Sequence, residues 1–271
     1  MELLPFVVSL AAALALAPAL RQSLHDGGQV RENYRGDRLP FPFGVLIGLS
    51  AVAALVVLAP LDELTDGDVL APELALIAPY ALGVAFLGLV DDALSGPSRG
   101  WRGHGAAVLR GAFSTGALKA IGSLGLALYV LRGHDDYLLA VAVLVLATNL
   151  FNLLDLRPGR AAKAFVLLGA GLTLGAWDLD PLWALGLFAA PVLAAGLYDL
   201  RERVMLGDAG SNVIGALAGL WLVLTLSTTG LAVAAAVLLL ITAYGEFRSL
   251  NALVERTPVL RFLDSIGRPH V

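Results

Sequence analysis

The chain is dominated by apolar runs that are each long enough to cross a lipid bilayer as a helix. A hydrocarbon core about 30 Å thick needs roughly 20 helical residues, and a helix satisfies its own backbone hydrogen bonds there. Of the 271 residues, 58% are hydrophobic and only 15% are charged. We therefore expect one all-α polytopic membrane domain over residues 1–271, with about nine spans. The predicted spans are 3–20, 42–60, 72–90, 106–130, 137–154, 162–177, 182–198, 210–226 and 230–247.

The distribution of charge between the loops predicts the orientation of these spans. Loops rich in Lys and Arg stay on the cytoplasmic side, and here they alternate with acidic loops in which Arg132 is the only basic residue. The N-terminus is accordingly expected outside and the C-terminus in the cytoplasm, in a multi-pass protein of the plasma membrane. The basic loops contain Arg21, Arg31, Arg35 and Arg38; Arg99 and Arg102; Arg157, Arg160 and Lys163; Arg201 and Arg203; and Arg248, Arg256, Arg261 and Arg268.

Two adjacent carboxylates, Asp91 and Asp92, follow directly on the third apolar run. A solvated helix end would explain them. However, carboxylates are unfavourable at a helix C-terminus, where the macrodipole is negative. A bound cation would remove that conflict.

Polar side chains also interrupt the end of the fifth run. Asn149, Asn152 and Asp155 follow one another at intervals of three residues, which places them on one side of a helix. Amides within a membrane are unfavourable unless they pair or line a cavity. These residues therefore either join helices or form an oxygen-rich wall for a hard cation or a uracil base.

The segment Gly207–Asn212 leads into the eighth run and carries Asp208 at the expected helix start. The flanking glycines let backbone amides approach a ligand. An ordinary N-cap is the alternative, since Asp and Ser are favoured at that position.

Carboxylates from three separate loops thus lie on one predicted face of the membrane. Oxygen ligands are typical of Mg²⁺ rather than Zn²⁺, and Mg²⁺ often accompanies phosphates. The chain also contains no Cys, which excludes thiolate sites. The pattern predicts phosphoryl transfer between a soluble donor and a lipid. The carboxylates concerned are Asp91, Asp92, Asp155 and Asp208.

The fourth run supplies two basic candidates for holding phosphates, Arg110 and Lys119. A lone ammonium inside a span is energetically unfavourable, which favours a function for Lys119. Alternatively, Lys119 reaches the membrane surface or pairs with an aspartate.

Three segments, in this order along the chain, resemble motifs of the polyprenyl-phosphate sugar-1-phosphate transferase family, which includes phospho-N-acetylmuramoyl-pentapeptide transferase. Residues 90–92 (VDD) resemble its aspartate pair. Residues 149–155 (NLFNLLD) resemble its NxxNLxD segment, and residues 207–211 (GDAGS) resemble its GDxGS segment.

This resemblance implies an enzyme of cell-envelope biogenesis that transfers a sugar-1-phosphate from a UDP-sugar to undecaprenyl phosphate and releases UMP. Mg²⁺ is the implied cofactor, with Asp208 as leading ligand beside Asp92 and Asn152. Asp91 and Asp92 would bind or deprotonate the lipid phosphate, while Asp155 would either attack covalently or shape the site. The residues expected to bind substrate are Asn149, Asn152, Arg110, Lys119, Gly210 and Ser211.

The expected partners are the membrane, polyprenyl phosphate, the UDP-sugar and a second copy in a homodimer, but no nucleic acid. The family's late His-rich loop has no counterpart here, which favours a small UDP-N-acetylhexosamine donor. Residues 249–271 mix apolar and basic side chains, which predicts an amphipathic cytoplasmic tail. Two alternatives are a secondary transporter, since polar residues in membrane helices can form an ion path, and a non-catalytic relative that binds polyprenyl phosphate.

Overall fold

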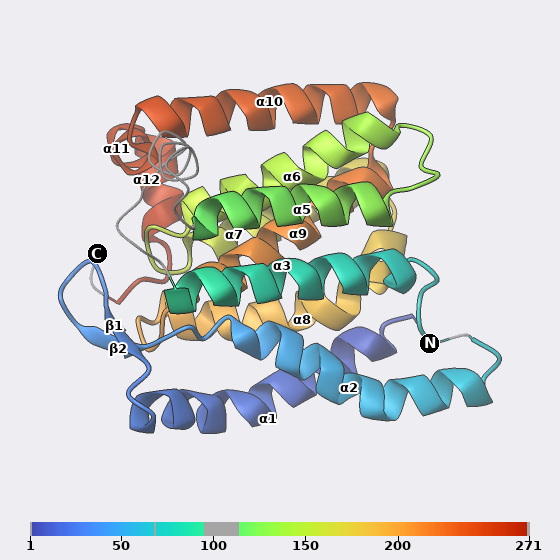
Figure 1. Cartoon of the computed structure of the whole chain (residues 1–271), viewed down its shortest axis with the longest axis horizontal. Helices are drawn as coiled ribbons and strands as arrows, with labels where there is room; N and C mark the ends of the chain where they lie inside the picture. The colour runs from blue at the N-terminus through green and yellow to red at the C-terminus, as the bar shows by residue number, and fades with distance from the viewer. Residues whose placement is uncertain (1, 68, 95–113, 270–271) are drawn as a thin grey trace.

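The computed structural model describes residues 2–67, 69–94 and 114–269, which form a bundle of long helices and one short sheet (Figure 1). In chain order the elements are α1 (Leu4–Asp26), β1 (Val30–Glu32), β2 (Arg38–Pro40), α2 (Val45–Leu64), α3 (Leu74–Leu94), α5 (Thr115–Val130), α6 (Tyr137–Leu154), α7 (Arg160–Ala176), α8 (Asp180–Leu200), α9 (Gly207–Thr225), α10 (Thr228–Phe247), α11 (Leu250–Arg256) and α12 (Pro258–Ser265).

Seven of the helices are long and apolar enough to cross a membrane: α1, α2, α3, α6, α8, α9 and α10. Helix α5 is apolar but shorter. It begins after Ser114, whose Oγ accepts a hydrogen bond from the Ala117 amide. Of the predicted span 106–130, the structure describes residues 114–130. These helices agree with a polytopic membrane protein, while the total of nine spans stays a prediction.

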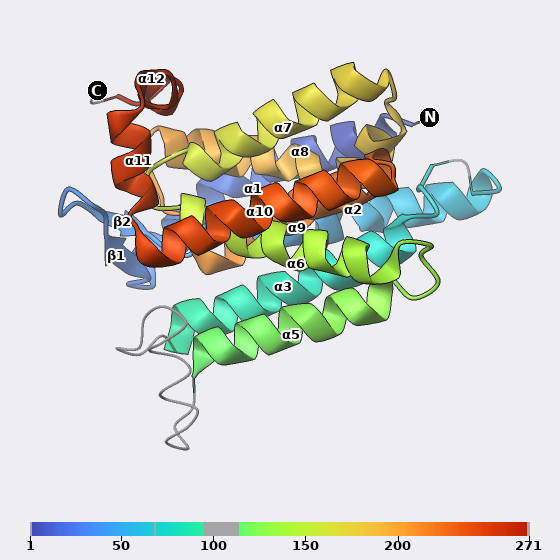
Figure 2. The same ribbon diagram turned by 90° about the horizontal axis from the view of Figure 1, so that it is seen from above.

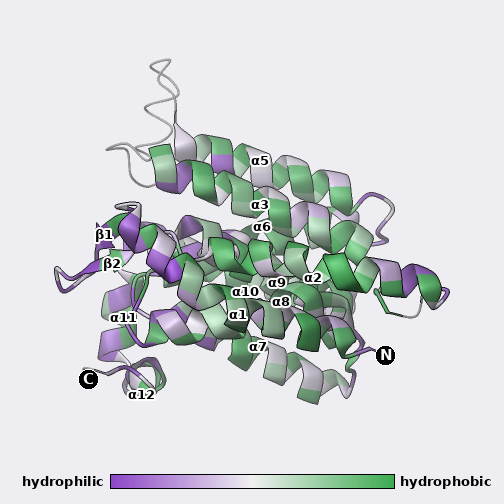
Figure 3. Cartoon of the chain, turned by 90° about the horizontal axis from the view of Figure 1, so that it is seen from below, coloured by the Kyte–Doolittle hydropathy of each residue, from purple (hydrophilic) through white to green (hydrophobic). Residues whose placement is uncertain are grey.

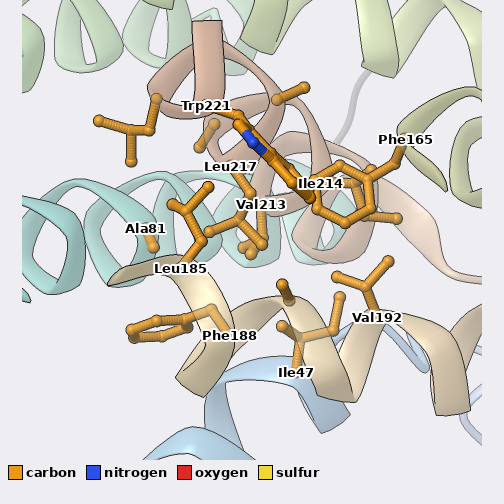
Figure 4. Close-up of a cluster of buried hydrophobic side chains, with 14 of the residues drawn as sticks. Ile47, Ala81, Phe165, Leu185, Phe188, Val192, Val213, Ile214, Leu217 and Trp221 are labelled. Carbon is orange, nitrogen blue, oxygen red and sulfur yellow. The ribbon is translucent and has the colours of Figure 1, made fainter. Parts of the chain in front are cut away.

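Helix α9 lies at the centre of the bundle and contacts α2, α3, α6, α7, α8 and α10. Small residues let neighbouring backbones approach it closely. A Cβ added at Gly215 would lie 2.7 Å from Thr148 Cα of α6. Larger side chains such as Ile214 and Leu217 fill the space toward α2, α3 and α8 (Figure 4).

Hydrophilic residues gather toward the ends of the bundle, whose long helices run roughly parallel (Figures 2 and 3). At one end α3, α6 and α8 finish, while α5, α7 and α9 begin; the sheet, α11 and α12 lie there too (Figure 1). We call this end the site end. The predicted basic loops within the described residues lie at this end.

The two-stranded sheet was not predicted from the sequence. Its antiparallel strands pair Val30 with Pro40, and its turn is closed by Asn33, whose Oδ1 accepts bonds from two backbone amides. The last residue of β2 bonds to the segment that precedes α9, because the Pro40 carbonyl accepts from the Met205 amide at 3.0 Å. The sheet is therefore attached to the start of α9.

Candidate functional site

Asp92 joins the end of α3 to the beginning of α9. Its Oδ1 accepts a hydrogen bond from the Asp208 amide at 3.0 Å, and its Oδ2 accepts one from the Ala209 amide at 2.9 Å. The first amides of a helix have no partner within the helix, and the positive end of the dipole favours an anion. The carboxylate that is unfavourable at the end of its own helix is thus stabilised at the start of another.

Lys119 of α5 connects two further carboxylates, those of Asp91 and Asp208. Its Nζ donates to Asp91 Oδ2 at 3.0 Å and also to Asp208 Oδ2. The Lys119 side chain is only 18% exposed, so an ammonium held by two carboxylates explains how it is tolerated within the bundle. Asp91 and Asp92 are consecutive on a helix and point in different directions, so one faces α5 and the other faces α9.

The predicted metal ligands Asp208, Asp92 and Asn152 all lie around the first turns of α9, where Asp92 accepts from the Asp208 amide and Asn152 donates to Ser211. Among the residues that the structure describes, no three His, Cys, Asp or Glu side chains form a group that could hold a metal ion. Asp91 shares Lys119 with Asp208, so these two carboxylates also lie close to each other. Mg²⁺ commonly uses one or two carboxylates and completes its shell with water and phosphate, so this oxygen pair is compatible with it.

The amides of α6 contribute in two ways. Asn152 Nδ2 donates to Ser211 Oγ at 3.1 Å and so joins α6 to α9, as one of the two interpretations of the sequence predicted. Asn149 and Asn152 also line a cavity of about 150 Å³ between α5, α6, α9 and α10. The polar residues of this cavity, which we call the polar cavity, are Lys119, Ser123, Thr148, Asn149, Asn152, Asn212 and Thr242.

Two buried polar atoms of the polar cavity have unused hydrogen-bonding capacity. Within the described part of the chain, neither Asn212 Nδ2 nor Thr242 Oγ1 has a partner. An unpaired buried polar group costs roughly 1–3 kcal/mol. The polar cavity is therefore suited to a polar guest.

A second hollow of about 180 Å³, the surface pocket, opens at the site end. The sheet supplies one wall and the segments after α6 and before α9 supply the others. Asp208 lines this pocket and Lys119 lines the polar cavity, so their ion pair lies between the two hollows. The polar and aromatic lining residues are Arg31, Asn33, Tyr34, Phe41, Asp92, Asp155, Arg157, Asp199 and Asp208.

Asp155 lies in the surface pocket directly after α6. Burial, together with the nearby carboxylates of Asp199 and Asp208, raises the pKa of Asp155 well above its usual range. Sequence reasoning missed Asp199, which accepts a hydrogen bond from the Gly159 amide at 2.6 Å. An aspartate at the end of an apolar run was the available signal, and the same signal had identified Asp92.

Gly210 and Ser211, which were predicted to bind substrate, lie in the closely packed start of α9. Gly210 packs against α2, because a Cβ added to it would lie 2.8 Å from Gly44 Cα. Gly210 thus allows α2 to approach the start of α9 closely. Ser211 is fully buried and bonds to Asn152. Arg110 lies outside the described residues.

Gly207 is required at the start of α9 for two reasons. Its φ of +72° is strained for other residues, and an added Cβ would lie 2.7 Å from Asp92 Oδ2. We expect Gly207→Ala to destabilise the protein by more than about 1 kcal/mol, lowering its unfolding temperature in detergent. Gly171→Ala is the control, because an added Cβ there meets nothing within 4 Å. Equal unfolding temperatures for both variants would contradict this role of Gly207.

A scan against known protein families finds no match, and a search of curated proteins finds no significant relative. A functional assignment therefore depends on the residues and geometry of the site.

Proposed function

We propose that the chain transfers a sugar-1-phosphate from a UDP-sugar to polyprenyl phosphate, such as undecaprenyl phosphate, and releases UMP. The observation that supports this most strongly is the meeting of Asp91 and Asp208 at Lys119, between a cavity among the helices and a pocket at the surface. Phosphoryl transfer depends mainly on positioning the reactants and neutralising charge. A membrane-embedded cation flanked by carboxylates suits both requirements.

The two hollows offer the two substrates separate approaches. The polar cavity lies among membrane helices, where the phosphate of a lipid can use the free donors of Asn212 and Thr242. The surface pocket suits the nucleotide, with Arg157 for phosphate and Tyr34 for the base. An oxygen of the lipid phosphate attacks the β-phosphorus, the bond to the α-phosphate breaks, and UMP leaves.

The proposed roles of the carboxylates follow from their surroundings. Mg²⁺ bound at this site would neutralise pyrophosphate charge, and Asp91 and Asp208 are the residues that would hold it. Asp92 orients α9 through its two amide contacts. Asp155 lines the surface pocket together with Asp199, where it would help to shape the nucleotide site. These roles favour a single displacement over covalent attack by Asp155.

The proposed topology places the site end in the cytoplasm and the N-terminus outside. Cysteines introduced at Glu63 and Asp135, which are exposed at the opposite end, should react with an impermeant thiol reagent added to intact cells. A cysteine at the exposed Arg201 should react only after lysis. The chain has no native Cys, so each variant carries a single thiol. Labelling at position 201 in sealed cells would reject the orientation.

The proposed reaction is tested by incubating the purified protein with undecaprenyl phosphate, Mg²⁺ and a panel of UDP-sugars while measuring UMP. We expect release with a small UDP-N-acetylhexosamine and little with the muramoyl-pentapeptide nucleotide. The polar cavity among four helices also gives a transporter some support. Uptake of a solute into proteoliposomes without UMP release would favour that function, and lipid binding without UMP release would favour a non-catalytic relative.

A further inference from the structure

An apolar groove lies on the side of the bundle formed by α7 and α8, apart from the proposed transferase site. Its cavity volume is about 320 Å³. Helix α7 contributes Val166 and Leu167, and α8 contributes Leu193 and Leu197, all four roughly half exposed. In a membrane-spanning bundle such side chains face hydrocarbon, and a groove between them is a place for a lipid chain.

The site end of the groove carries positive charge. Lys163 lines both this groove and an adjoining apolar pocket of about 160 Å³, whose wall also includes Arg160. Within the described residues, Lys163 Nζ donates to three backbone carbonyls, those of Leu263, Asp264 and Ile266. No ion pair joins Lys163 to a carboxylate within the described residues.

The neighbouring arginines share one carboxylate. Asp264 Oδ1 accepts from Arg160 Nε at 2.8 Å and from Arg268 Nη2 at 2.7 Å. Arg160 Nη1 is buried and has no hydrogen-bond partner in the described part of the chain. Two arginines therefore share the Asp264 carboxylate, and the ammonium of Lys163 lies nearby without bonding to it. The buried Nη1 of Arg160 remains able to donate a hydrogen bond.

Helix α12 lies at the site end of the bundle (Figure 2), and its residue Leu263 lines the groove. On its outer face Val259 and Phe262 are each 67% exposed, and Arg261 is exposed beside them. An exposed apolar face next to basic residues is typical of a helix lying in the interfacial layer of a membrane. The basic cluster at the groove is thus at the depth of lipid headgroups.

We propose that this groove binds an anionic phospholipid, with an acyl chain between α7 and α8 and the phosphate beside Lys163 and Arg160. Basic pockets between membrane helices are suited to anionic headgroups, whereas a zwitterionic headgroup gains less from uncompensated cations. The bound lipid contacts α7, α8 and α12 together. It therefore fixes the C-terminal tail to the bundle, whether or not the chain is a transferase.

The test uses delipidated full-length protein in neutral detergent. Phosphatidylglycerol added to the micelles should raise the unfolding temperature by about 5 °C more than phosphatidylcholine does. Inorganic phosphate alone should cause no shift. Native mass spectrometry of an equal mixture of the two lipids should show preferential retention of phosphatidylglycerol. Equal retention, or an equal shift with phosphate alone, would overturn the proposal.

Two test variants, each with a control variant, separate the contribution of the groove from that of the charge. Leu197→Trp should fill the groove and remove the increment due to phosphatidylglycerol, whereas Val237→Trp, at a similarly exposed position on α10, should retain it. Lys163→Gln should reduce the preference for the anionic lipid, and Lys163→Arg should restore it. Retention of the full increment by Leu197→Trp, or of the full preference by Lys163→Gln, would refute this site.

Discussion

Replacing Asp208 with Asn should reduce Mg²⁺-dependent UMP release on the order of 10²-fold or more, because a neutral amide weakens metal binding and the stabilisation of developing charge. The fold should persist. The backbone amide of residue 208 still donates to Asp92, and Lys119 keeps its bond to Asp91. The measurement is initial-rate UMP release by protein reconstituted with undecaprenyl phosphate.

Asp135→Asn is the matched control, since Asp135 is an exposed aspartate at the opposite end of the bundle. It should turn over at the wild-type rate. Asp91→Asn should lose activity, because Asp91 is the second carboxylate at Lys119. If Asp208→Asn released UMP as fast as the wild type, Asp208 would serve only the start of α9 and the proposed active site would be wrong.

Replacing Lys119 with Met should destabilise the protein by about 2 kcal/mol or more, because Asp91 and Asp208 would then face each other without their shared cation. For a protein of this size we expect the unfolding temperature in detergent to fall by roughly 5 °C. Activity should be lost as well, since the ammonium would no longer be present to attract phosphate.

A double variant distinguishes this charge effect from a loss of packing. Lys119→Met combined with Asp208→Asn leaves one carboxylate instead of two, so part of the lost stability should return while activity stays absent. Strictly additive effects of the two substitutions would indicate that Lys119 and Asp208 do not interact energetically.

The helices could be predicted well because each apolar run has to span a similar thickness. The predicted span 137–154 coincides with α6, yet α1 continues to Asp26, beyond its predicted end at residue 20. Hydropathy marks the part of a helix that suits hydrocarbon, whereas backbone hydrogen bonds extend the helix past the first polar residues. The strands of the sheet are three residues long, too short for a periodic pattern.

The sequence identified most of the aspartates of the site but not their contacts. Which of Asp91 and Asp92 faces α5 depends on the rotation of α3 about its axis, and long-range packing against α9 sets that rotation. Asp199 directly follows the seventh predicted span, 182–198, but α8 continues to Leu200, and the bond from the Gly159 amide to Asp199 depends on how α7 packs against α8. The partnership of Lys119 with both carboxylates likewise requires the positions of three helices.

The central position of α9 has a consequence for the order in which the protein matures. The amides that bond to Asp92 and the carboxylate that bonds to Lys119 both belong to the first turn of α9, which the ribosome makes after α1 to α8. Until α9 enters between α3 and α6, Asp92 lacks these two donors and Lys119 has only Asp91. A nascent chain that ends before residue 207 would therefore retain the Lys119–Asp91 pair but would lack the two amides that bond to Asp92 and the carboxylate of Asp208.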